Sequence, residues 1–386
     1  MGVRMERKKQ QKLFIIHFQP LELFPPAMNM IDYLSRISEQ KIIVITNKNS
    51  NLDLLSKYEP VNVKIYRPAK LSGPSMYRYL NYFFFYLSAF FLLLRHHPKL
   101  VLYFETLSSW PALMYKKIKK RTSLMVHYHE YTEPKLYGEG MFLVRWMHEI
   151  ETKMYGKFSW ISHTNPVRLQ IFKNDEKLES MSASIFHVLP NYPPKSWLTI
   201  KKNDSLKNKK KRLVFVGSLG YKNMYLQEVI DWLDIHPEEL SLDIYAYKID
   251  EKAKQVLAKA NNKNIRYCGG CDYFSLPEIL INYDIGLVIY KPFSQNTIHA
   301  VSNKVFEYLA CGLDVWFSVD MTYTFEYARQ SVYPKVIPVN FKELNSFDFA
   351  LAISKENLQY EASPFFYENV YPEVLNHINV ENDLCE

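Results

Sequence analysis

The chain has 386 residues, of which 48% are hydrophobic and 23% are charged, and this balance excludes an intrinsically disordered protein. Four cysteines in a chain of this length exclude a disulfide framework and favour a reducing compartment. The net charge of +8 favours an anionic partner, either a phosphate-bearing substrate or an anionic membrane surface.

Strands and helices alternate along the first half of the chain. Short apolar runs predict strands at residues 13–18, 41–46, 61–66, 100–104, 123–127, 158–162 and 185–189. The segments between them predict helices at residues 26–37, 76–95, 110–119, 142–155 and 166–173. The first run contains His17 and lacks a small-x-small cleavage site, so we interpret it as a strand and not as a signal peptide. Apolar strands alternating with helices predict a parallel sheet covered on both faces.

The same pattern restarts in the second half, after a proline-rich segment and a basic stretch at 201–212. Further strands are predicted at residues 213–216, 242–245, 265–267, 285–289, 315–317 and 336–338. The length suits two domains of about 150 to 200 residues each. Ligands of such sheets bind beyond the carboxyl ends of the strands, so we expect loops of both domains to face a cleft. A last apolar stretch at 365–378 predicts a closing helix.

Residues 79–94 (YLNYFFFYLSAFFLLL) raise the question of membrane contact. They are fewer than the roughly 20 residues that a spanning helix needs, and they include Asn81 and Ser88. A helix covering the sheet is the favoured interpretation, an interfacial membrane helix is the second, and a span is the least favoured. The basic stretch at 201–212 is interpreted as a solvated linker or a contact with lipid headgroups. No nucleic-acid recognition fold accompanies it, so nucleic acid is not an expected partner.

Cys268 and Cys271 have the CxxC spacing of a redox pair or of half a zinc site. The sequence has no second CxxC, and the pair follows a predicted strand at a glycine turn. A structural turn is therefore favoured, and no metal site is expected.

The most informative stretch is SNKVFEYLACGLDVWFS, residues 302–318. It predicts a helix that opens with Ser302, Asn303 and Lys304 and carries Glu307 one turn later. The N–H groups at the start of a helix suit a phosphate, and a carboxylate one turn further can accept two hydrogen bonds from a ribose diol. The alternative is that Lys304 and Glu307 form an exposed i,i+3 ion pair on an ordinary surface helix.

With these residues the segment resembles the donor-nucleotide helix of GT-B glycosyltransferases, particularly the family-4-like bacterial enzymes, whose motif is roughly N-K-x-x-E-Y-x-A-x-G-x-P-V. The positions that match are Asn303, Lys304, Glu307, Tyr308, Ala310, Gly312 and Val315. Asp314 departs from the motif, which usually has proline there. The resemblance implies the GT-B fold, in which two doubly wound, Rossmann-like α/β domains face a cleft. It also implies that Glu307 binds the ribose of a nucleotide sugar, so Glu307→Ala is expected to abolish donor binding with little loss of stability.

The domain boundaries follow from this resemblance. We expect an acceptor-side domain at 1–190, a linker at 191–212, a nucleotide-sugar-binding domain at 213–360, and a helix at 361–386 that returns to the first domain.

Other donor-side candidates follow from the same resemblance. The turn that begins at Gly217 resembles the family's V-G-x-L turn, and Lys222 and Lys304 are the candidates to hold the diphosphate. Tyr273 is either a stacking partner of the base or a core aromatic residue. His299 stands where retaining members have a glutamate near the donor sugar, and this departure weakens the expectation of retention.

On the acceptor side, LMVHYHEYTEP resembles the family's D-x-H-E at the end of a parallel strand, with His127 in place of the aspartate. The catalytic candidates are therefore His129, Glu130 and His127. A histidine there can donate a hydrogen bond to a sugar hydroxyl or shuttle a proton near neutral pH. Both histidines can also be structural, hydrogen-bonded groups.

The resulting expectation is a metal-independent, retaining glycosyltransferase that requires no cofactor beyond its nucleotide-sugar donor. Its acceptor would be a glycan or a lipid-linked saccharide in bacterial surface polysaccharide synthesis. We expect a cytoplasmic protein with peripheral contact to the anionic inner face of the membrane. A nucleotide-sugar epimerase and a non-catalytic GT-B descendant that binds a glycan or a partner are the alternatives.

Overall fold

The computed structural model describes residues 12–38, 40–48, 58–70, 75–198, 210–260, 263–354 and 358–384. Most of the basic stretch, at 201–209, and Cys385 lie outside these residues. The chain divides into two compact units, which are Met1–Asn191 with Tyr367–Glu386, and Tyr192–Phe366. We call them unit 1 and unit 2.

Unit 1 is built on a seven-stranded parallel sheet with the order β3-β2-β1-β4-β5-β6-β7. Its strands are β1 (Lys12–His17), β2 (Lys41–Thr46), β3 (Val63–Tyr66), β4 (Leu100–Phe104), β5 (Ser123–Tyr128), β6 (Trp160–His163) and β7 (Phe186–Val188). Every residue of β4 and β5 is buried, as expected for central strands covered on both faces.

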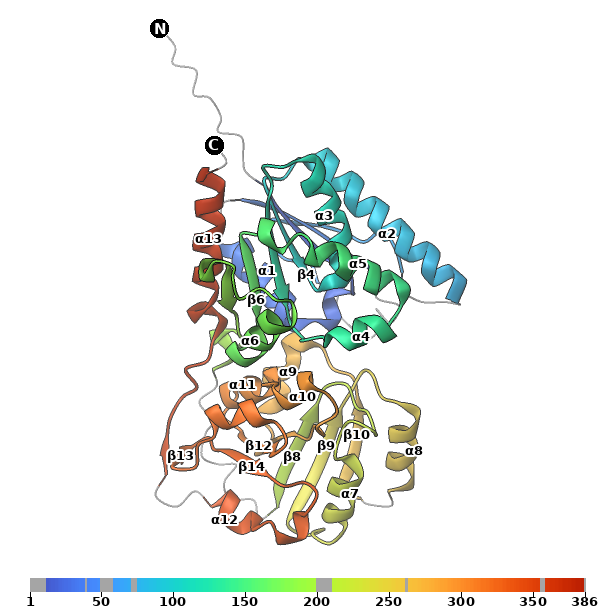
Figure 1. Cartoon of the computed structure of the whole chain (residues 1–386). Helices are drawn as coiled ribbons and strands as arrows, with labels where there is room; N and C mark the ends of the chain where they lie inside the picture. Colours follow the sequence, from blue (N-terminus) through green and yellow to red (C-terminus); the bar gives the residue numbers. More distant parts are fainter. Residues whose placement is uncertain are drawn as a thin grey trace. The chain divides into compact units, whose positions relative to one another are not determined.

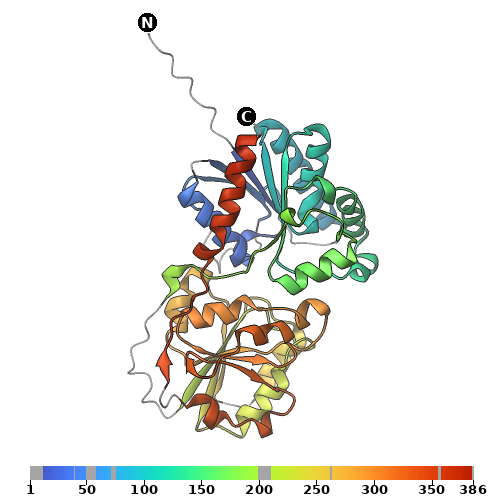
Figure 2. The same ribbon diagram turned by 60° about the vertical axis from the view of Figure 1, so that its left-hand side comes forward.

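The helices of unit 1 are α1 (Pro25–Ile37), α2 (Ser75–His96), α3 (Ser109–Ile118), α4 (Pro134–Glu139), α5 (Phe142–Thr152), α6 (Pro166–Asp175) and α13 (Tyr371–Leu384). Helix α3 packs against α2 and α5, and α13 packs against α1 (Figures 1 and 2). The predicted closing helix begins six residues later than expected, at Tyr371. Pro372 suits the first turn of a helix, and the buried ring of Tyr371 lies 5.6 Å from that of Tyr33 on α1.

Unit 2 contains a six-stranded parallel sheet with the order β10-β9-β8-β11-β12-β14. The strands are β8 (Lys211–Val216), β9 (Leu240–Tyr245), β10 (Ile265–Gly269), β11 (Ile285–Val288), β12 (Asp314–Ser318) and β14 (Val336–Val339). A separate pair joins β13 (Val332–Tyr333) to β15 (Gln359–Tyr360). The helices are α7 (Leu226–Asp234), α8 (Glu251–Lys259), α9 (Leu276–Leu280), α10 (Gln295–Ile298), α11 (Asn303–Ala310) and α12 (Phe349–Ile353).

The two sheets have the same winding, and the predicted pair of doubly wound parallel sheets is confirmed. In each, the chain moves outward in one direction and then returns to the middle, so the order reverses between β1 and β4 in unit 1 and between β8 and β11 in unit 2. Ligands of doubly wound sheets bind at this reversal, beyond the carboxyl ends of the strands. The residues that follow these four strands are therefore the candidates for a ligand-binding site.

The predicted sheet-covering helix at 76–95 is α2. It is anchored by Phe85, Ala89 and Leu93, which are fully buried in the core of unit 1. None of the helices formed by the described residues combines the length and the apolar character needed to cross a membrane.

Gly286 on β11 provides a test of the packing in unit 2. A Cβ atom at this position would lie 2.1 Å from Cδ2 of Tyr308, whose ring is fully buried. Gly286→Ala must therefore displace α11, and we expect a loss of about 1–3 kcal/mol of stability. Thermal denaturation should show a melting temperature lower by several degrees. The matched control is Gly156→Ala, where a Cβ meets nothing within 4 Å. Equal melting temperatures for both variants would contradict the packing described here.

Candidate functional site

In unit 2 the candidate donor residues meet at the start of α11. Ser302 caps the helix, and its Oγ accepts a hydrogen bond from the Lys304 N–H at 3.4 Å. Glu307 Oε1 accepts a hydrogen bond from Asn303 Nδ2 at 2.6 Å, and its Oε2 pairs with Lys304 Nζ at 2.7 Å. The i,i+3 ion pair of Lys304 and Glu307 is therefore present. It is not an exposed pair, because the side chain of Glu307 is only 2% accessible. The expectation that Glu307→Ala costs little stability rested on an exposed side chain, and this premise was wrong.

The turn after β8 lies beside this helix. Gly217 has a φ of 142°, which a residue with a side chain rarely adopts. A Cβ added to it would lie 4.0 Å from Lys304 Cε, so the turn and the lysine are neighbours. Tyr308 fixes this arrangement, because its hydroxyl oxygen accepts a hydrogen bond from the Val216 N–H at 3.0 Å. Lys222, further along the same turn, is exposed.

The glycine turn after β10 approaches the same helix. The Cys271 thiol lies within the electrostatic influence of Lys304 and Glu307. Burial raises its pKa to about 11, and the neighbouring Lys304 opposes that shift only in part. Cys268 and Cys271 are not joined to each other, and a half-buried thiol that stays protonated is a poor nucleophile or metal ligand. The structural interpretation of this CxxC is favoured.

Two further donor candidates, Tyr273 and His299, have other neighbours. Tyr273 is 5% exposed, and its ring lies 4.7 Å from that of Trp197, an arrangement typical of a core aromatic residue. His299 ends α10, where its ring nitrogens lie 3.1 Å from Gln295 Oε1 and 3.4 Å from Thr322 Oγ1. Neither residue is brought to Glu307 by a contact described for this structure.

In unit 1 the two candidate histidines lie at the end of β5, and their rings are 4.6 Å apart. His127 Nδ1 lies 2.9 Å from Ser162 Oγ, and burial lowers the pKa of His127 to about 3. His129 stacks on Phe104 at 5.1 Å, and burial followed by the nearby His127 and His17 lowers its pKa well below the usual value. Both imidazoles are neutral at pH 7, so the expected proton shuttle near neutral pH does not fit. Glu130 is exposed.

The residue that sequence reasoning missed is Glu105, which directly follows β4 at the reversal of the sheet. Its Oε1 accepts hydrogen bonds from the N–H groups of His129 at 2.6 Å and Glu130 at 3.3 Å. Its φ of 62° lies in the left-handed region, which is unusual for glutamate. Burial, and next the charge of Glu130, raise the pKa of Glu105 to about 8. Its position directly after the predicted strand at 100–104 was the signal that could have identified it.

Two more polar residues complete this cluster. His17 at the end of β1 is buried, and its Nδ1 donates a hydrogen bond to the Gln19 carbonyl at 2.6 Å. Burial lowers its pKa to about 4, so this imidazole is neutral as well. Arg168 of α6 donates to the His129 carbonyl and to Thr164 Oγ1, each at 3.0 Å. The ends of β1, β4 and β5 thus place His17, Glu105 and His129 in one polar cluster.

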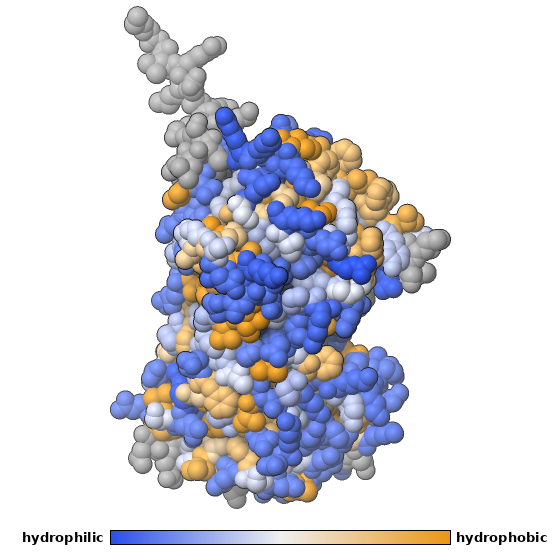
Figure 3. Space-filling model, viewed as in Figure 1, coloured by the Kyte–Doolittle hydropathy of each residue, from blue (hydrophilic) through white to orange (hydrophobic). Residues whose placement is uncertain are grey.

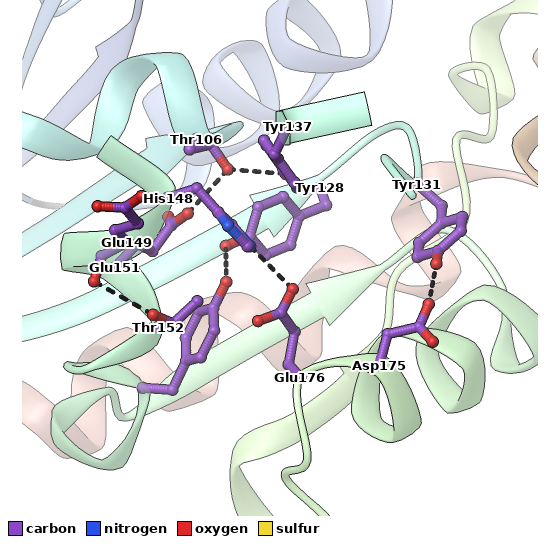
Figure 4. Close-up of polar contacts among 11 residues, drawn as sticks. Thr106, Tyr128, Tyr131, Tyr137, His148, Glu149, Glu151, Thr152, Asp175 and Glu176 are labelled. Carbon is purple, nitrogen blue, oxygen red and sulfur yellow. Dashed lines mark hydrogen bonds and ion pairs between the residues drawn. The ribbon is translucent and has the colours of Figure 1, made fainter. Parts of the chain in front are cut away.

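A second network holds the loop that carries Glu105 (Figure 4). Glu151 of α5 is fully buried, and it accepts hydrogen bonds from the hydroxyls of Thr106 at 2.8 Å and Tyr103 at 2.5 Å. Thr106 Oγ1 also lies 3.1 Å from the Tyr137 hydroxyl of α4. Because Thr106 adjoins Glu105, these bonds hold the loop that carries Glu105. This network is a positioning element.

Comparison with known proteins gives the fold and little else. No family model matches the sequence, and no curated protein matches it. Among solved structures, sucrose-phosphate synthase from Thermosynechococcus elongatus is similar at a TM-score of 0.64 with 13% identity, over 96% of this chain and 98% of that one. The lipopolysaccharide outer core galactosyltransferase WaaB gives 0.58 and 10%, over 95% and 99%. UDP-GlcNAc 2-epimerase from Neisseria meningitidis, bound to UDP-GlcNAc, gives 0.59 and 12%, over 96% and 99%. The predicted GT-B fold is thereby confirmed.

Proposed function

We propose that this chain is a family-4-like glycosyltransferase that transfers a sugar from a nucleotide-sugar donor to a glycan or lipid-linked acceptor in bacterial surface polysaccharide synthesis. The observation that carries the proposal is the cluster of Asn303, Lys304 and the buried Glu307 at the start of α11, beside the Gly217 turn. This cluster lies at the reversal of the unit 2 sheet, where such folds bind their ligands.

On the donor side, the start of α11 and the Lys304 ammonium are suited to the diphosphate. The ribose hydroxyls replace Asn303 and Lys304 as hydrogen-bond donors to Glu307, which frees the lysine to turn toward the phosphates. Lys222 on the Gly217 turn supplies a second cation from the exposed side. With two cations and helix N–H groups, the leaving diphosphate is stabilised by the chain's own groups.

On the acceptor side, Glu105 is the best-suited proton acceptor. As the acceptor oxygen bonds to the anomeric carbon, its proton passes to the Glu105 carboxylate, and the bond from that carbon to the nucleoside diphosphate breaks. His129, neutral at pH 7, orients the acceptor by hydrogen bonding. His127 is tied to Ser162 and supports His129. Transfer in one displacement with Glu105 as the base inverts the anomeric configuration, whereas the family resemblance alone implies retention. The anomeric configuration of the product, read by NMR, decides between these two outcomes.

The second candidate is a nucleotide-sugar epimerase, because several UDP-GlcNAc 2-epimerases share this fold at similar TM-scores. An epimerase converts the donor without an acceptor, whereas a transferase releases nucleoside diphosphate only as the acceptor is consumed. The non-catalytic alternative rests on Ser218, His127 and His299, which stand where the family prefers charged residues. Such a protein would bind nucleotide weakly or not at all.

The test is a thermal-shift comparison with UDP, GDP, CDP and ADP, each at millimolar concentration and without added metal. A nucleotide at 100 times its dissociation constant should add about 2.7 kcal/mol, which raises the melting temperature by several degrees. We expect one of the four to stabilise the protein more than the others. An unchanged melting temperature with all four nucleotides would contradict the donor site and favour the non-catalytic alternative.

A further inference from the structure

An aromatic stripe runs along the outer side of α2. The side chains that form it are large, apolar and more than half exposed: Tyr77, Tyr79, Leu80, Phe83, Phe84 and Phe91. The opposite side of the helix, with Phe85, Ala89 and Leu93, is fully buried. Figure 3 shows the hydrophobic colouring gathered at the upper right, where α2 lies in Figure 1. The exposed rings are not among the buried residues that form the core of unit 1, so packing of that core does not account for their apolar character.

Helix α5 extends this apolar surface. Phe142 is 71% exposed and Trp146 is 37% exposed, and both line an apolar groove of about 440 Å³ together with Tyr79 and Phe83 of α2. A second groove, of about 570 Å³, follows α2 past Phe84 and Phe91. A contiguous exposed apolar area of this kind marks an interaction surface in a folded protein. We call it the α2–α5 face.

The charge along α2 and α3 is positive, whereas the exposed carboxylates Glu139 and Glu149 lie on α4 and α5. Between residues 60 and 129 the sequence has a single carboxylate, Glu105, which is partly buried. The same segment carries many basic side chains: Lys64, Arg67, Lys70, Arg78, Arg95, Lys99, Lys116, Lys117, Lys119, Lys120 and Arg121. Lys117, Lys119, Lys120 and Arg121 are exposed at the end of α3, which packs on α2.

We propose that the α2–α5 face docks on an anionic lipid bilayer, with α2 in the plane of the interface. Its aromatic rings enter the boundary between headgroups and acyl chains, and the surrounding lysines and arginines bind the anionic headgroups. Tyrosine and tryptophan are the side chains that favour this boundary. A second copy of the chain would bring the same positive charge against itself, and a bilayer supplies the opposite charge.

This inference rests on the proposed function only for its biological purpose, which is access to a lipid-linked acceptor. Vesicle binding without nucleotide tests the face, and nucleotide binding without vesicles tests the donor site. The two can therefore fail separately.

The experiment is flotation of the full chain with phosphatidylcholine vesicles, with and without 30% phosphatidylglycerol. We expect binding to the anionic vesicles, at least a tenfold lower partition coefficient with neutral ones, and weakening at high salt. The double variant Phe84→Ser with Phe142→Ser should reduce partition at least tenfold. Phe293→Ser is the matched control, because Phe293 is also 71% exposed but belongs to unit 2. Both variants change exposed rings, so their melting temperatures should equal that of the wild type.

Failure to float with anionic vesicles would overturn the proposal, and so would unchanged partition of the double variant. Sedimentation velocity provides a further check. A wild-type dimer that becomes monomeric in the double variant would assign the face to a second copy and also overturn it.

Discussion

Glu307→Ala is expected to lower the affinity for the preferred nucleoside diphosphate by about 100-fold, measured by isothermal titration calorimetry. Two charge-assisted hydrogen bonds to the ribose are lost, each contributing about 1.5 kcal/mol, or about 3 kcal/mol together. The same variant should also lose about 1–3 kcal/mol of stability, because Lys304 is left without its counter-charge in a half-buried position. Since its side chain keeps 14% exposure, the loss stays below that of a fully buried pair.

Glu251→Ala is the matched control for this experiment. Glu251 pairs with Lys254 at 3.6 Å with the same i,i+3 spacing, but both side chains are more than half exposed. Loss of an exposed pair should change stability by less than about 1 kcal/mol and leave nucleotide affinity unchanged. An unchanged affinity in Glu307→Ala would remove the central residue of the proposed donor site.

Glu105→Gln is expected to slow sugar transfer by about 100-fold or more at pH 8, because it removes a general base and keeps its shape. The amide oxygen can still accept the two backbone hydrogen bonds from His129 and Glu130, so the loop should remain in place. With a pKa of about 8, the Glu105 carboxyl is largely protonated at pH 7. The wild-type rate should therefore rise with pH and level off above about 8, and the variant should show no such rise.

The pH dependence of stability provides an independent test of the raised pKa of Glu105. The pKa of Glu105 in the folded chain is about 8, above its ordinary value of 4.5, so the folded state holds this proton more tightly. Its contribution to stability is fully present below pH 4.5 and is lost as the pH rises through 8. Glu105→Gln should flatten this part of the stability profile. Glu179→Gln is the control, because Glu179 is an exposed carboxylate of unit 1 and is not among the charges that act on Glu105. A wild-type rate independent of pH between 6 and 9 would count against Glu105 as the base.

The architecture was predictable because short apolar runs mark the strands, and the alternation of strands with helices indicates parallel sheets. Each predicted strand is present within two residues of its expected bounds. The α11 segment was identified in detail because a cap, a short spacing and a terminating glycine are all local features. The helices that were not predicted are α4, α7, α8, α9, α10 and α12.

The chemistry of unit 1 was less predictable, because burial decides it. His127 and His129 were selected as residues able to titrate near neutral pH, yet the strands around them exclude water and keep them neutral. Glu105 was not predicted as a site residue, because a single acidic residue after a strand is not a motif. Its raised pKa depends on the neighbouring loops, which are distant in sequence. The low exposure of the Lys304–Glu307 pair could not be predicted either, because ion pairs with i,i+3 spacing usually lie on the exposed side of a helix.

The most direct test of the central claim is a crystal structure of the protein with the nucleoside diphosphate that stabilises it most. The account predicts the ribose hydroxyls within hydrogen-bond distance of the Glu307 carboxylate. It also predicts the diphosphate between the start of α11 and the Gly217 turn, with Lys304 turned away from Glu307. A nucleotide bound elsewhere, with the Lys304–Glu307 pair intact, would contradict it.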